Sequence, residues 1–171
     1  MDSPTSVRLA ILFVAGGTAL RLIPHPWNFS PLVALALFSG AYLKSRWGAA
    51  ALLAVLFLSD AILGFHVTMP FTWGAAALVM FLGRRVGGAF SPAVFGGALG
   101  GSLVYFFLTN LGVFLLENLY PKTWAGLWEC YVMALPFFRN SVAGDLVYTA
   151  ALFGVFHIAR AFHGSRATQI P

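Results

Sequence analysis

The chain has 171 residues, of which 60% are hydrophobic and only 9% are charged. A soluble domain carries about 25% charged residues, so this composition excludes a soluble globule as well as a disordered chain and predicts an integral membrane protein. The formal net charge is +5, but the basic residues lie singly or in pairs at the ends of apolar segments, which is typical of membrane orientation signals and not of a nucleic-acid partner.

Six apolar segments follow one another along the chain, separated by charges or by proline and glycine. The first ends at Pro24-His25-Pro26, because two prolines forbid a helix there. The second and fourth are shorter than the roughly 20 residues that span a bilayer, so we expect them to extend by a turn or to lie behind longer helices. The expected helices cover residues 7–23, 31–43, 47–65, 70–82, 93–116 and 141–162.

The stretch from Glu117 to Asn140 is too polar and too interrupted to span a bilayer, yet it is rich in aromatic residues. It predicts an interfacial helix or cap that lies along the membrane surface before the last spanning helix. No internal repeat or linker divides the chain, so we expect a single transmembrane domain over residues 1–171. The predicted fold class is all-α, a polytopic membrane helix bundle of about six transmembrane helices.

The basic residues are divided unequally between the two ends of such a bundle. With six spans, seven of the ten lie on the side that holds both termini. Because basic residues accumulate on the cytoplasmic side, we expect both termini in the cytoplasm and the elaborated connections outside. The residues on the side of the termini are Arg8, Lys44, Arg46, Arg84, Arg85, Arg160 and Arg166, and those on the opposite side are Arg21, Lys122 and Arg139.

Four polar side chains are expected near the outer surface at similar depth. A rise of about 1.5 Å per residue places Asp60, Asn110 and Asp145 there, with Arg139 at the surface itself. An Asp at the centre of a membrane helix costs roughly 2.5–3.5 kcal/mol, so such groups face a protein interior or a cavity. Two interpretations stay open. In the first, the role is structural: Asp145 pairs with Arg139, and Asp60 forms a hydrogen bond to a neighbouring helix. In the second, the cluster forms the floor of an outward-facing pocket.

Several kinds of chemistry have no support in the sequence. It contains no metalloprotease, hydrolase, Walker A or dinucleotide-binding motif, so we expect neither an enzyme nor an ATP site. The single cysteine, Cys130, excludes an internal disulfide and a Cys-based zinc cluster, and His157 has no second intramembrane histidine to complete a haem site. We therefore expect no metal and no cofactor. The spacing Ala15-x-x-x-Ala19 permits close helix approach, either within the bundle or to a partner.

Residues 34–49, followed by Ser59-Asp60 and Gly64, resemble the substrate-binding S components of energy-coupling factor vitamin transporters. Those proteins often have a short second helix, a glycine-containing basic turn and an Asp near the outer end of the third helix. The resemblance implies that Ala15 and Ala19 dock a transmembrane coupling subunit, which works with ATPases. Residues 21–31 and 135–145 also resemble a family of uncharacterised bacterial inner-membrane proteins related to that fold.

These features predict a multi-pass protein of the bacterial inner membrane that binds a small solute, a vitamin or its precursor, from outside. Its aromatic residues would stack on a flat ring and its polar groups would set the orientation. The expected partners are the lipid bilayer, the solute and a coupling subunit, and no nucleic acid. Two alternatives remain: a non-catalytic small subunit of a larger membrane complex, or a solitary ion-coupled carrier. The predicted ligand-binding residues are His25, Trp27, Asn28, Asp60, His66, Asn110, Trp128, Arg139, Asn140 and Asp145.

Overall fold

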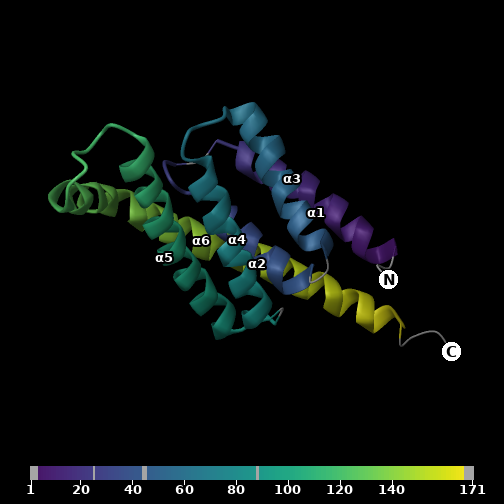
Figure 1. The fold of residues 1–171 in the computed structure, drawn as a ribbon. Coiled ribbons are helices and arrows are strands. Elements are labelled where there is room, and N and C mark those ends of the chain that lie inside the picture. The colour runs from purple at the N-terminus through teal and green to yellow at the C-terminus, as the bar shows by residue number, and fades with distance from the viewer. Residues whose placement is uncertain (1–3, 25, 44–45, 88, 168–171) are drawn as a thin grey trace.

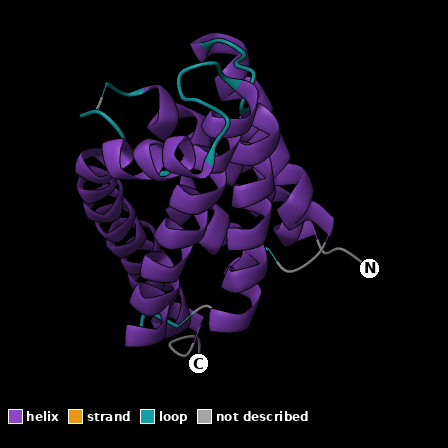
Figure 2. Ribbon diagram, turned by 60° about the vertical axis from the view of Figure 1, so that its left-hand side comes forward, coloured by secondary structure: helices purple, strands orange, loops and turns teal. Residues whose placement is uncertain are grey.

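A computed structural model of the chain describes residues 4–24, 26–43, 46–87 and 89–167. In these ranges the regular structure is entirely helical, as Figure 2 shows, and the all-α prediction is confirmed. The first five helices begin and end within four residues of their predicted bounds. The six helices are α1 (Pro4–Leu22), α2 (Leu32–Tyr42), α3 (Arg46–Leu63), α4 (Met69–Val86), α5 (Pro92–Leu116) and α6 (Trp124–Ala167).

Proline and glycine set many of the helix ends. Prolines stand in the first turn of α4 and of α5, where the missing N–H costs nothing because that group has no partner inside a helix. Gly64 and Gly87 follow the ends of α3 and α4 with φ angles of 106° and 82°, which only glycine adopts readily. These prolines and glycines therefore mark positions at which helices begin or end.

The short helix α2 lies inside the bundle, in contact with α3, α4, α5 and α6. All of its residues from Leu32 to Ala41 are buried. It packs against α4 backbone to backbone, because a Cβ on Gly40 would overlap the carbonyl oxygen of Met80 and a Cβ on Gly83 would overlap that of Leu37. The prediction that the second segment lies behind longer helices is confirmed.

The other helices surround α2. Helix α1 packs against α3, α4 packs against α5, and α5 packs against α6. The start of α1 and the end of α6 lie at one end of the bundle, whereas the connections 64–68 and 117–123 lie at the opposite end (Figure 1). We call these the terminal end and the loop end.

Helix α6 departs from the prediction. From Trp124 onward, the expected cap and the expected last helix form one continuous helix of 44 residues, with Pro136 inside it. The prediction of a separate interfacial helix is therefore wrong. Contacts with α5 explain the continuity across the proline, because the rings of Tyr131 and Phe138 on either side of it lie 5.8 and 4.6 Å from the ring of Phe106.

Two helices are long and apolar enough to cross a membrane. They are α5 and residues 124–159 of α6, while α2 and residues 47–63 of α3 are shorter apolar helices. By length and composition, the described part of the chain thus supports membrane association through two helices. A six-span topology goes further than this finding.

Candidate functional site

A cavity of about 350 Å³ opens among α1, α4, α5 and α6. Its wall is formed by the end of α1, the connections 23–31 and 64–68, and one face each of α4, α5 and α6. Ten of its side chains carry a hydroxyl, amide, imidazole or guanidinium group. The lining residues are Arg21, Asn28, Ser30, His66, Thr72, Ser102, Tyr105, Phe106, Thr109, Asn110, Val113, Ala134, Phe137, Phe138 and Ser141.

Helix α5 supplies the longest part of this wall. Six lining residues lie between Ser102 and Val113 at spacings of three and one, which is a single face of a helix. Thr109 Oγ1 donates to the carbonyl of Tyr105 and Asn110 Nδ2 to that of Phe106, both at 2.8 Å. These bonds to the preceding turn satisfy polar side chains inside an apolar helix and hold them at fixed positions on the wall.

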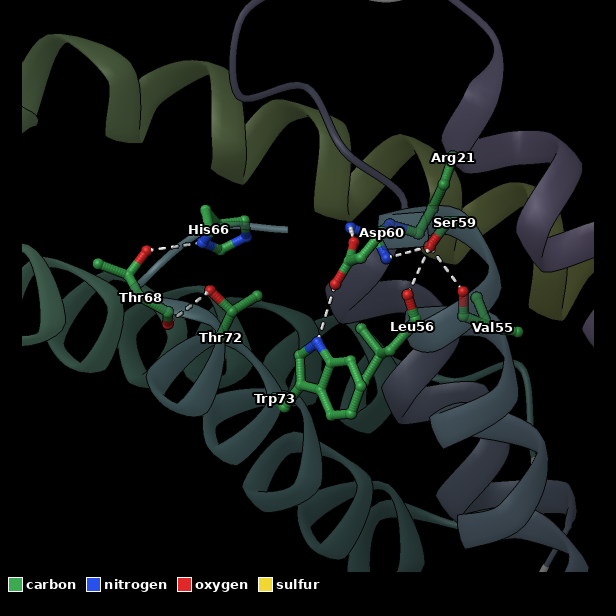
Figure 3. A network of polar contacts seen from close by, with 9 residues as sticks. All are labelled: Arg21, Val55, Leu56, Ser59, Asp60, His66, Thr68, Thr72 and Trp73. Carbon is green, nitrogen blue, oxygen red and sulfur yellow. Dashed lines mark hydrogen bonds and ion pairs between the residues drawn. The ribbon is translucent and has the colours of Figure 1, made fainter. Parts of the chain in front are cut away.

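The connections place two further polar residues on the wall. Asn28 has a φ of 59°, a left-handed conformation that Asn tolerates better than most residues. This turn brings the chain back after α1, with the N–H of Phe29 donating to the carbonyl of Pro26. His66 precedes α4, and its Nδ1 lies 2.8 Å from the hydroxyl of Thr68 (Figure 3).

The charged part of the wall is Arg21, which pairs with Asp60 of α3. The distance from Arg21 Nη2 to Asp60 Oδ1 is 2.9 Å, and the two side chains are only 10% and 3% exposed. Asp60 Oδ2 accepts a 2.8 Å hydrogen bond from Trp73 Nε1 of α4. Figure 3 shows the carboxylate between the guanidinium and the indole, so a single acid joins α1, α3 and α4.

Ser59 holds the same guanidinium from a second side. Arg21 Nη1 donates to Ser59 Oγ, and that hydroxyl donates in turn to the carbonyl of Val55 at 2.6 Å. The buried cation therefore has both a counter-charge and a neutral acceptor, which is the arrangement that a buried ion pair requires.

The second buried acid, Asp145 of α6, has a different environment. It is 4% exposed, and its Oδ2 lies 2.6 Å from the hydroxyl of Ser102 on α5. The same hydroxyl lies 2.9 Å from the carbonyl oxygen of Ala98. Ser102 lines the cavity whereas Asp145 lies behind it.

The predicted pairing of Asp145 with Arg139 is wrong. Among the described residues the ion pair formed is that of Arg21 and Asp60, and Arg139 is exposed. The reason is the continuity of α6, because residues six apart on an α-helix point to different faces. Arg139 would have been able to fold back toward Asp145 only if the helix had begun after it.

The nine predicted ligand-binding residues that the structure describes fall into three groups. Asn28, His66 and Asn110 line the cavity, and Asp60 and Asp145 stand behind other lining residues. Trp27 and Trp128 are 81% and 73% exposed and lie outside the wall, as does Arg139. Asn140 donates to the carbonyl of Trp27 at 3.2 Å, which ties the first connection to α6. His25 lies outside the described residues.

Several lining residues were not predicted. Arg21 was counted only as an orientation signal, although its position inside Leu20-Arg21-Leu22 at the end of an apolar helix already indicated a buried charge. The hydroxyls of α5 repeat at helical spacing with Asn110, and that periodicity was the available signal. The aromatic residues of the cavity are those of α5 and α6, not the tryptophans of the connections.

The architecture is that of an all-helical bundle with a polar cavity toward its loop end. The chain matches the family described as "Family of unknown function (DUF6580)" over residues 2–167, and it belongs to that family. No curated protein and no solved structure matches the chain.

Proposed function

We propose that this protein is a multi-pass membrane protein that binds a small solute in the cavity at its loop end. The observation that carries the proposal is the polar cavity itself, in a chain that is 60% hydrophobic. Buried polar side chains are expensive in a membrane and usually face a water-filled or ligand-filled space. A volume of about 350 Å³ is within the range of roughly 300–1,000 Å³ that is usual for small-molecule sites.

The membrane setting is supported by the surface of the bundle. Large apolar side chains are exposed along the helices, among them Phe57 of α3, Phe81 of α4 and Phe107 of α5. A soluble protein rarely exposes such a surface, whereas lipid covers it at no cost. We propose that the six helices form one bundle in the bacterial inner membrane, with the basic terminal end in the cytoplasm.

Helix α6 is longer than this membrane is thick. Its 44 residues extend over about 66 Å, against roughly 30 Å of hydrocarbon. The part near Trp124 and Trp128, whose indoles are exposed, is the part that we place outside the hydrocarbon core. Exposed tryptophans are typical of that boundary.

We further propose uptake in the manner of an S component, without catalysis by this chain. In support, Ala15, Gly16 and Ala19 are exposed on α1, which leaves the small-residue face accessible to a coupling subunit. The same face favours the second candidate function, a structural subunit of a larger membrane complex. The two differ in whether the cavity holds a solute.

The test is native mass spectrometry of gently extracted protein, with two variants that place Phe on α6. Ser141→Phe fills the cavity, and Val147→Phe is its control because Val147 is 55% exposed on the surface. We expect a small molecule on the wild type and on Val147→Phe and none on Ser141→Phe. Retention of a protein partner alone, with no thermal shift from a panel of vitamins and precursors, would favour the structural subunit.

A further inference from the structure

The charged groups around the cavity are arranged unequally. Arg21 lines the wall, whereas the fifteen lining residues include no Asp and no Glu. The two nearby acids do not line the cavity but contact residues that do: Asp60 pairs with Arg21, and Asp145 is hydrogen-bonded to Ser102. The Arg21–Asp60 pair therefore turns its positive end toward the cavity.

Arg21 has donors left for a ligand. A guanidinium carries five N–H groups in a planar fork. Within the described residues, its bonds to Asp60 and Ser59 use one N–H on each Nη atom. Both acceptors belong to α3, which is not part of the cavity wall. The remaining N–H groups match the paired oxygens of a carboxylate, which a guanidinium binds more strongly than a neutral acceptor.

The carboxylate of Asp60 does not cancel the attraction of Arg21 for an anion, because Asp60 is held in place outside the cavity wall. Asp60 is 3% exposed on its side chain, and its second oxygen is occupied by the indole N–H of Trp73. A ligand carboxylate therefore does not need to displace Asp60. The pair fixes the guanidinium in advance, so that little freedom is lost on binding.

Five of the fifteen lining side chains are apolar. Phe106 of α5 and Phe138 of α6 have ring centroids 4.6 Å apart, and Phe137 and Val113 line the cavity with them. These groups can cover a ring or a short hydrocarbon body but cannot satisfy a second charge. The volume of about 350 Å³ sets a limit near that of one ring system with its substituents.

We propose that the ligand of this cavity is a small organic carboxylate, with its carboxylate on Arg21 and its ring or apolar body against Phe106, Phe137 and Phe138. This inference rests on the proposed function, because it names the substrate class of the same cavity. Asp145 is hydrogen-bonded to Ser102 and does not line the cavity.

The test compares three probes of one shape and different charge: benzoate, benzamide and benzylammonium. Their binding to the wild type in nanodiscs is measured by saturation-transfer NMR. We expect benzoate to bind about tenfold more tightly than the other two, and Arg21→Gln to remove that preference. Arg21→Lys keeps the charge and should retain part of the preference.

The outcomes separate the two proposals. If benzamide or benzylammonium binds as tightly as benzoate and Ser141→Phe abolishes that binding, the cavity binds solutes but the carboxylate inference is wrong. If none of the three probes binds and the extracted protein retains no small molecule, the proposed function itself fails. The charge ranking on the wild type needs no variant, so unfolding of Arg21→Gln leaves the test decisive.

Discussion

Asp60 and Asp145 are both buried acids one residue behind the wall of the same cavity, but their partners differ in kind. Asp60 accepts from a guanidinium and an indole and so joins three helices. Asp145 is bonded to one hydroxyl, which joins α5 to α6. The difference shows that equal burial does not mean an equal role, because a buried charge is stabilised only by the groups that compensate it. On the Arg21 side of the cavity the buried acid is compensated by a cation, whereas on the Ser102 side it is compensated by a neutral hydroxyl.

The largest effect should come from Asp60→Ala. It leaves the buried guanidinium of Arg21 without its counter-charge, and breaking one member of such a pair typically costs about 3–5 kcal/mol. Unfolding by SDS titration, followed by circular dichroism, measures the loss. The double variant Arg21→Leu with Asp60→Leu should lose less, because no unpaired charge remains. Wild-type stability of Asp60→Ala alone would show that the ion pair does not support the fold.

A smaller effect is expected at Asp145. Asp145→Leu removes the partner of Ser102, but that hydroxyl can still donate to the carbonyl of Ala98, so we expect a loss of about 1 kcal/mol. Asp145→Asn keeps an oxygen that can accept from Ser102 and should cost less. The same SDS titration checks both. In the Asp145→Leu background, Ser102→Ala should add almost nothing, and a full additional loss would mean that the two residues are not coupled.

The smallest effect should be that of Arg139→Ala. Its side chain is exposed on a different face of α6 from Asp145, and exposed substitutions away from special features usually change stability by less than about 0.5 kcal/mol. The SDS titration should give a midpoint close to that of the wild type. A loss comparable to that of Asp60→Ala would restore the pairing of Arg139 with Asp145 that the structure argues against.

Much of the fold could be predicted because its signals are local. The interruptions at Pro24 and Gly64 correspond to helix ends, and the short second segment is the buried helix α2. The polarity of the stretch 117–140 does not predict that it continues the last helix from Trp124 onward. Its helical state depends on the packing of Tyr131 and Phe138 against α5, and a contact between distant segments is not visible in a local pattern.

The site was harder to predict than the fold. Depth along each helix predicts Asp60 and Asn110 as ligand-binding residues at a similar level. Asn110 lines the cavity, but Asp60 stands behind Arg21 and does not line it. Depth does not give the rotation of a helix, and for that reason Arg139 was placed beside Asp145. The tryptophans illustrate a second limit, because an aromatic residue in an outer connection suits a ligand or a membrane boundary equally well. Trp27 and Trp128 are exposed and belong to the surface.

The burial of α2 has a consequence for how the protein is made. An 11-residue helix is only about 16 Å long, half the thickness of the hydrocarbon layer, and in a bilayer its ends would be unsatisfied if it stood alone. In the proposed membrane bundle, the buried place of α2 exists only where the surrounding helices have gathered, so we expect the longer helices to insert before α2 docks. The glycine contacts at Gly40 and Gly83 then act at the last step of assembly. An added methyl group at either glycine would overlap a backbone carbonyl of the facing helix and keep α2 and α4 from packing this closely.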